Sequence, residues 1–220
     1  MISCSKSQQN NGFSDTIPPS PLSFPMITAQ FLEALALAAQ RTSGPIIVPW
    51  PVPGNPGGFV SFADFPEWQS FVLNLGLRVG IPDIVTARFE RAQKLHLLAW
   101  IDFDLIKAGE LIALTALEFA LMDRYAPHAK EKYGNTKFAH LLRYMPEHDG
   151  LTDAKVPMIR RSGGTIIDLV KGTRKPSLAD IRNDSAHGYP FDGFPWAGML
   201  ELVRDLVEYA YRHSLQHSAA

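Results

Sequence analysis

The stretch from residue 83 to residue 125 constrains the fold most, because it contains no proline and only one glycine, Gly109. Apolar residues recur along it at three- and four-residue spacing, which is the period of a helix that buries one face. We therefore expect one long helix, or two helices joined near residues 102–109. Pro127 is expected to end this run, because proline lacks the N–H that a position inside a helix donates.

Shorter helical segments lie on both sides of this stretch. Thr28 and Asp64 are suited to cap two of them, and Ser177 followed by Asp180 is an acidic form of the capping box. Gly188 and Pro190 are expected to end the helix that Ser177 begins. We expect these helices over residues 26–41, 66–79, 137–144, 156–170 (divided near residues 163–164), 177–188 and 195–213.

Residues 43–66 are rich in proline and glycine and contain two short β-prone runs, residues 46–50 and 59–62, around PGNPGG. The prolines confine a small hairpin to an edge, or leave a loop. The expected fold class is therefore all-α: an up-and-down helical bundle with an irregular Pro/Gly-rich N-terminal extension. We expect a flexible tail over residues 1–25, a helix with the Pro/Gly-rich segment over residues 26–80, and the bundle over residues 81–215.

Composition excludes several classes of protein. The 220 residues include 46% hydrophobic side chains, enough for a sizeable core, and carry a formal net charge of −1, which does not indicate nucleic acid. The longest uncharged run in the most apolar region, residues 111–117, is far shorter than the roughly 20 residues of a spanning helix. The single cysteine, Cys4, fits a reducing compartment. We expect a cytoplasmic protein with no membrane contact, metal site or cofactor.

The segment IRNDSAHGY, residues 181–189, carries the clearest chemical pattern. Arg182 is a planar cation suited to phosphate, and His187 can exchange a proton near neutral pH. Asn183 and His187 are four residues apart and share a helix face. This set suits metal-free RNA cleavage, in which His187 removes the ribose 2′-OH proton and Arg182 stabilises the charge on the phosphoryl oxygens.

Two features weaken a site made by one chain. Arg182 and His187 are five residues apart, about 140° around a helix, and converge only if the last turn loosens before Gly188. The leaving 5′-oxygen also needs a second proton-transfer group, which the second His187 of a homodimer would supply. The alternative is an ordinary helix end, in which Arg182 pairs with Asp180 or Asp184 and His187 hydrogen-bonds the last carbonyls.

The pattern Arg–x4–His, with Asn183 directly after Arg182 and Ala-His-Gly at the end, resembles the signature of HEPN domains. Tyr189 extends the likeness to the Arg–x4–His–x–Tyr form of HEPN toxins. Residues 99–126, with an inner Glu118, resemble the long first helix of the family, and residues 137–145 resemble its short second helix. The likeness covers residues 83–213.

The resemblance implies an all-helical dimer that is a metal-independent endoribonuclease, with arginine and histidine of both protomers in a shared cleft. The expected catalytic residues are Arg182, Asn183 and His187, and the expected partners are RNA, a second copy of the chain and a cognate antitoxin. Some family members are inactive binding or scaffold proteins, and this reading stays open. So does a third, an unrelated helical interaction domain with an accidental motif.

A local excess of basic residues precedes the motif, between residues 155 and 175. It could follow an RNA backbone or be a solvated face. Trp196 in FDGFPW could frame a cleft near His187 or seal the bundle. Glu110, Glu118 and Asp123 share the long helix and are expected to be surface charge with one buried carboxylate. The expected binding residues are Tyr189, Asp184, Arg160, Arg161, Lys171, Arg174 and Lys175.

Overall fold

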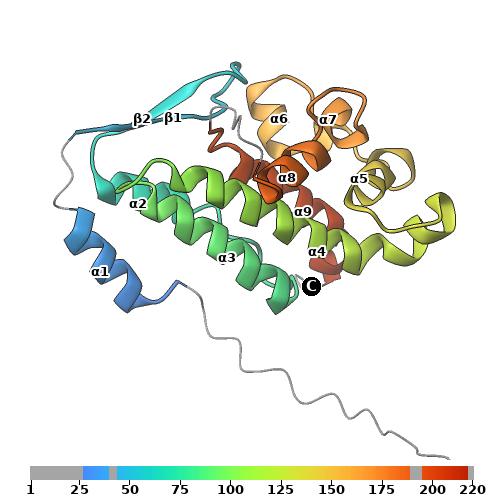
Figure 1. Ribbon diagram of the computed structural model, residues 1–220, viewed down its shortest axis with the longest axis horizontal. Helices are drawn as coiled ribbons and strands as arrows, with labels where there is room; N and C mark the ends of the chain where they lie inside the picture. Colours follow the sequence, from blue (N-terminus) through green and yellow to red (C-terminus); the bar gives the residue numbers. More distant parts are fainter. Residues whose placement is uncertain (1–26, 40–43, 189–194, 218–220) are drawn as a thin grey trace, which may run out of the picture.

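The computed structural model describes residues 27–39, 44–188 and 195–217, and these residues are mostly helical (Figure 1). The expected tail over residues 1–25 lies outside the described residues. The all-α class is confirmed, with one two-stranded hairpin among the described residues. The elements are α1 (Ala29–Ala39), β1 (Ile46–Pro49), β2 (Phe59–Phe62), α2 (Phe65–Leu73), α3 (Asp83–Leu98), α4 (Leu105–Tyr133), α5 (Phe138–Glu147), η1 (Asp153–Lys155), α6 (Pro157–Ser162), α7 (Ile167–Lys171), α8 (Leu178–Ala186) and α9 (Met199–His217).

Helix α4 forms the centre of the bundle and contacts α3, α5, α8 and α9 (Figure 1). Of the two expected alternatives, one long helix or two, the structure has two, with the break at residues 99–104 and Gly109 inside α4. Gly109 allows them to approach closely, because a Cβ there would lie 2.5 Å from Nδ1 of His96. Burial of His96 lowers its pKa to about 4, so the imidazole is neutral at pH 7, with Nδ1 2.8 Å from the carbonyl oxygen of Ala92.

Pro127 does not end the long helix, contrary to expectation, and α4 continues to Tyr133. An interior proline costs about 3 kcal/mol. Packing beyond it offsets that cost, because Ala129 is fully buried and the Tyr133 ring lies 5.0 Å from the ring of His140 on α5. The helix ends instead at Gly134, whose φ of 73° is the left-handed conformation that favours glycine.

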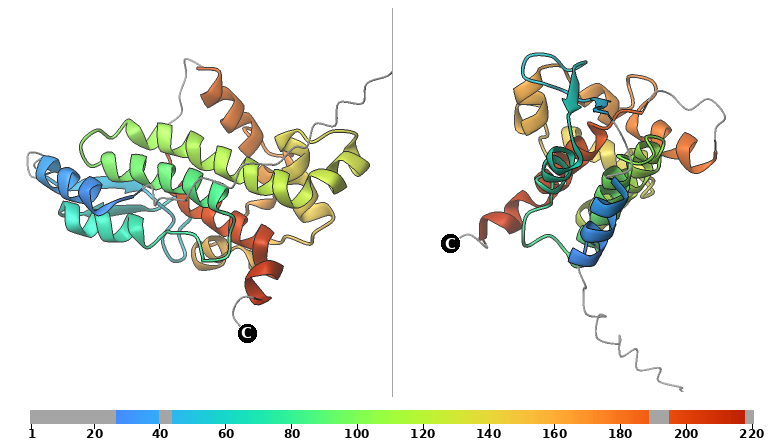
Figure 2. Two further views of the ribbon diagram at one scale, coloured as in Figure 1. Left: turned by 90° about the horizontal axis from the view of Figure 1, so that it is seen from below. Right: turned by 90° about the vertical axis from the view of Figure 1, so that its left-hand side faces the viewer.

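The N-terminal segments lie at one end of the bundle and α5 lies at the other (Figure 2). The expected hairpin is present, with antiparallel register from Ile46 opposite Phe62 to Pro49 opposite Phe59. Trp50 and Trp68 belong to the same buried core as α4 and α9, so the core continues across residue 80.

Several helix boundaries differ from expectation for local reasons. Thr28 and Asp64 accept hydrogen bonds as caps, from the N–H groups of Phe31 and Glu67. Helix α2 ends at Leu73, earlier than expected, because the N–H groups of Leu75 and Gly76 bond three residues back and tighten the chain into a turn. Helix α9 begins at Met199 and not at residue 195.

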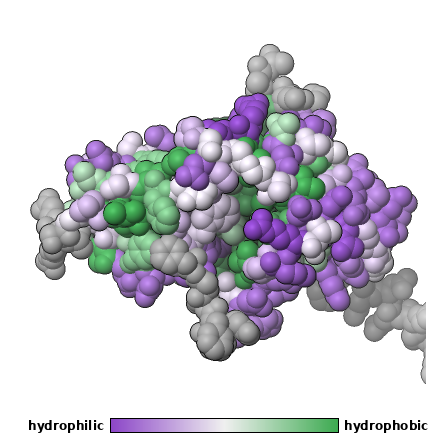
Figure 3. All heavy atoms as spheres, turned by 90° about the horizontal axis from the view of Figure 1, so that it is seen from above, coloured by the Kyte–Doolittle hydropathy of each residue, from purple (hydrophilic) through white to green (hydrophobic). Residues whose placement is uncertain are grey.

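The surface seen from above is uneven in character (Figure 3). Hydrophobic residues gather over the end that carries the hairpin, and hydrophilic residues cover the end that carries α5. Ile47 and Phe59 of the hairpin are 57% and 61% exposed. Within the described ranges, no helix combines the length and apolar character needed to cross a bilayer.

Candidate functional site

Helix α8 carries the Arg–x4–His motif and is fixed at its start by the expected capping box. The Ser177 Oγ accepts from the N–H of Asp180 at 3.2 Å, and the Asp180 carboxylate accepts from the N–H of Ser177 at 2.8 Å. Leu178 and Ala179 are buried against the bundle. The helix ends at Ala186 with His187 as its C-cap, and Gly188 follows with φ 66°, as the sequence predicted for this glycine.

Arg182 points from α8 toward α4, where it meets Glu118. Its Nη2 lies 2.5 Å from Oε2 of Glu118, and its Nη1 donates to the side-chain oxygen of Asn183 at 3.1 Å. The side chains of Arg182 and Glu118 are 27% and 24% exposed. The guanidinium is therefore held in one orientation near the surface, with its Nε buried and without a hydrogen-bond partner among the described residues.

His187 lies at the last turn of α8, where the helix loosens. Its backbone has φ −96° and ψ 4°, and its N–H still donates to the carbonyl of Asn183 at 3.0 Å. The His187 imidazole is exposed and makes no hydrogen bond to any described residue. Asn183 and Asp184 are exposed on the same helix, and Tyr189 lies outside the described residues.

The alternative of an ordinary helix end for Arg182 is not what the structure shows. Asp180 bonds Lys175 at 2.6 Å and Ser177, and these contacts lower the pKa of Asp180 to about 2. Arg182 pairs with Glu118 of α4 and not with Asp180 or Asp184. Glu118 is thus part of the candidate site. The sequence identified it only as one of three acidic residues on the long helix. The inner Glu of the long helix was the only signal that pointed to it.

The basic residues expected to bind RNA do not form one surface. Arg161 donates to Glu201 at 2.6 and 2.8 Å and to the carbonyl of Pro51, so its guanidinium is occupied by partners within the chain. Arg160 lines a different hollow, beside Arg78 and Arg212. Lys171 lies in the last turn of α7.

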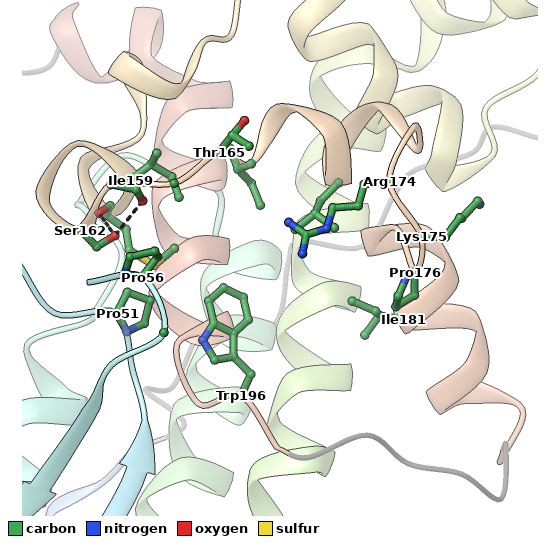
Figure 4. A pocket seen from close by; sticks show the side chains of 16 residues that line it. Pro51, Pro56, Ile159, Ser162, Thr165, Arg174, Lys175, Pro176, Ile181 and Trp196 are labelled. Atoms are coloured by element: carbon green, nitrogen blue, oxygen red, sulfur yellow. Dashed lines mark hydrogen bonds between the residues drawn. The ribbon is translucent and has the colours of Figure 1, made fainter. Parts of the chain in front are cut away.

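Arg174 and Lys175 line a pocket of about 480 Å³ beside α8 (Figure 4). The hairpin loop, α6, the segment of α7 and α8 form its walls, and Trp196 stands in it. Trp196 therefore frames a cavity, although His187, beside which a cleft was expected, is not among the residues that line it. Ile181, directly before Arg182, contributes the α8 wall.

In the part of the chain that the structure describes, no three His, Cys, Asp or Glu side chains gather as a metal site requires. Glu110, the buried carboxylate expected on the long helix, pairs with Lys107 at 3.2 Å and accepts from the N–H of Trp196. Comparison of the chain with protein-family models, curated proteins and solved structures finds no match.

Proposed function

We propose that this protein is a HEPN-type, metal-independent endoribonuclease that acts as a toxin or defence component with a cognate antitoxin. The observation that carries the proposal is the end of α8, where Arg182, held by Glu118, lies on the same short helix as the exposed His187. The likeness of the Arg–x4–His motif to HEPN domains supports the reaction class. Arg182, Asn183 and His187 are the proposed catalytic residues.

The proposed reaction breaks the RNA chain without water as nucleophile. A base takes the proton of the ribose 2′-OH, the 2′-oxygen bonds to the adjacent phosphorus, and the bond to the 5′-oxygen breaks as that oxygen gains a proton. A 2′,3′-cyclic phosphate and a 5′-hydroxyl result. Arg182 stabilises the negative charge on the phosphoryl oxygens, and Asn183, which already bonds the guanidinium, steadies it.

A second proton-transfer group can come from either of two places. Glu118 offers a carboxylate within the same chain, 2.5 Å from the guanidinium. A homodimer offers the second His187, as the family resemblance implies. Met122, one turn after Glu118 on α4, is 39% exposed and offers an apolar contact for a second copy of the chain, whereas the equally exposed Phe119 ring is covered by the Arg88 guanidinium, 3.6 Å from its centroid.

The test is cleavage of a heterogeneous RNA in EDTA by the wild type and by His187→Ala. His148→Ala is the matched control, because His148 is also an exposed residue at a helix C-cap. We expect cleavage by the wild type and the control, loss of at least about 100-fold in His187→Ala, and no cleavage of the 2′-deoxy strand. Cleavage by neither wild type nor His187→Ala, or equally by both, overturns the proposal.

Mixing two inactive variants distinguishes a shared site from a one-chain site. If the protomers share a cleft, Arg182→Ala and His187→Ala together form heterodimers in which one wild-type arginine and one wild-type histidine coexist. Recovered cleavage then supports the homodimer, and its absence, together with a monomeric mass in light scattering, supports the role of Glu118.

The same ion pair favours a second candidate function, an inactive HEPN-like protein that binds RNA or serves as a scaffold. A carboxylate 2.5 Å from the Arg182 guanidinium neutralises part of the charge that a phosphate would need. This candidate predicts that Glu118→Gln strengthens RNA binding while no variant cleaves. Cleavage that depends on His187 excludes it.

A further inference from the structure

The pocket beside α8 has the size and walls of a small-ligand site. Its volume of about 480 Å³ falls in the usual range of roughly 300–1,000 Å³ for such sites. The walls are largely apolar and come from segments far apart in sequence, among them Pro51 and Pro56 of the hairpin loop, Ile159 of α6 and Ile181 of α8. The polar side chains are few, with Ser162 on the α6 side and Arg174 and Lys175 on the α7–α8 side (Figure 4).

Trp196 presents a fixed aromatic ring inside this pocket. Figure 4 shows its indole standing between the hairpin prolines and the α7–α8 side. Its backbone N–H donates to the buried carboxylate of Glu110. Gly198 allows the ring its place, because a Cβ there would lie 3.0 Å from Nε1 of Trp196 and 2.6 Å from Pro51. A ring held this way loses little conformational entropy when another ring stacks on it.

Arg174 supplies a cation across from this ring. Its guanidinium points over the pocket toward Trp196, whereas Lys175 points away (Figure 4). Arg161 and Arg182 are tied to carboxylates, and Lys175 is tied to Asp180. The Arg174 guanidinium has no ion pair or hydrogen bond to any described residue, so its donor fork is open for a planar or tetrahedral anion.

We propose that this pocket binds one nucleotide of a single-stranded RNA, with the base stacked on Trp196 and the phosphate held by Arg174. Base stacking on an aromatic side chain with a nearby arginine on the backbone is the general chemistry of single-strand recognition. The assignment deepens the proposed function and rests on it for the choice of RNA. Ile181 lines the pocket and Arg182 follows it, so a strand held here lies beside the proposed catalytic helix.

The test measures binding directly, by calorimetry, with an oligoribonucleotide whose 2′-O-methyl groups prevent cleavage. Trp196→Leu removes the stacking face and is expected to weaken binding roughly tenfold or more, whereas Trp196→Phe keeps an aromatic face and retains most of the affinity. Arg174→Gln is expected to weaken binding and to lower the slope of log affinity against log salt by about 0.7, the value for one phosphate. Arg91→Gln, an exposed arginine of α3 outside the pocket, is the matched control and leaves both unchanged.

Competition experiments with smaller ligands identify which part of the strand the pocket binds. A nucleoside monophosphate is expected to compete with the strand, and a nucleoside or inorganic phosphate alone to compete more weakly. Tighter binding of the free monophosphate than of the strand overturns the assignment to RNA. Equal affinity of wild type, Trp196→Leu and Arg174→Gln, in variants whose urea unfolding matches the wild type, overturns the pocket itself.

Failure here is separable from failure of the ribonuclease proposal. If cleavage depends on His187 while strand binding is indifferent to Trp196 and Arg174, the ribonuclease stands and the pocket proposal falls. If binding depends on Trp196 and Arg174 while His187→Ala cleaves like the wild type, or neither cleaves, the pocket stands and the ribonuclease falls.

Discussion

Two arginine–glutamate pairs of nearly equal length hold different parts of this protein. Arg161 meets Glu201 at 2.6 Å, and Arg182 meets Glu118 at 2.5 Å. The Glu201 side chain is only 4% exposed and also accepts from Nε1 of Trp50, whereas the Glu118 side chain is 24% exposed. The first pair joins α6, α9 and the hairpin, and the second joins α8 to α4.

The two pairs differ in the solvent access of their carboxylates and not in distance. Both arginine side chains are partly exposed, Arg161 at 40% and Arg182 at 27%. A buried carboxylate depends on its hydrogen-bond and ion-pair partners, because an uncompensated buried charge lowers the stability of the fold. A pair at the surface contributes little to stability, since water can replace either partner. The buried Glu201 therefore needs Arg161 as a partner, whereas the more exposed Glu118 can give up Arg182 to water or to a phosphate.

The largest expected effect separates two adjacent arginines of α6. Arg161→Met leaves Glu201 short of its main partner, and we expect the free energy of unfolding in urea to fall by about 3 kcal/mol. Arg160→Met, the exposed neighbour, is the matched control and should change it by less than about 0.5 kcal/mol. Equal effects of the two substitutions would show that the Arg161–Glu201 pair contributes no more to stability than an exposed arginine does.

The second expected effect is on the pH dependence of stability. Burial acts to raise the pKa of Glu201, but hydrogen bonds from Arg161 and Trp50 outweigh it and hold the pKa below its ordinary value of 4.5. A lowered folded pKa contributes stability that is present above pH 4.5 and is lost as the pH falls through the folded pKa.

Unfolding of the wild type and Glu201→Gln, compared from pH 7 to pH 3, measures this contribution. The stability difference between them should be largest at pH 7 and shrink in acid, where the wild-type carboxyl also becomes neutral. A difference that stays constant or grows in acid would mean that the charge of Glu201 contributes nothing.

The smallest expected effect on stability comes from Glu118→Gln. Because this pair is near the surface, the free energy of unfolding should change by less than about 1 kcal/mol. RNA cleavage should fall at least about tenfold, since an amide neither takes a proton nor holds the guanidinium as firmly. A large loss of stability would place Glu118 with Glu201 as a structural residue. Faster cleavage would contradict its part in the reaction.

The features that the sequence predicts well are those decided by neighbouring residues. The break between α3 and α4, the capping box of Ser177 and Asp180, and the hairpin all follow from local spacing. The prediction that Pro127 ends the long helix was wrong, because packing of Ala129 against the rest of the bundle outweighs the tendency of proline to end a helix.

The site was harder to predict because its contacts join distant parts of the chain. Nothing in the local sequence distinguishes Arg160 from Arg161, and both are exposed, yet only Arg161 reaches Glu201, 40 residues away. Glu118 and Arg182 are 64 residues apart, and only the crossing of α4 and α8 joins them. The HEPN likeness, the RNA target and the dimer stay predictions.

The hairpin has a consequence for how the protein can be shortened. Its loop supplies Pro51 and Pro56 to the pocket, and its Gly54 N–H bonds the carbonyl of Arg161 at 3.1 Å. Proteolytic removal of residues 1–80 would leave the Arg–x4–His motif intact but would remove one wall of the pocket and open it to solvent. It would also uncover the core that Trp50 and Trp68 now fill. The minimal folding unit is therefore longer than the stretch that carries the motif.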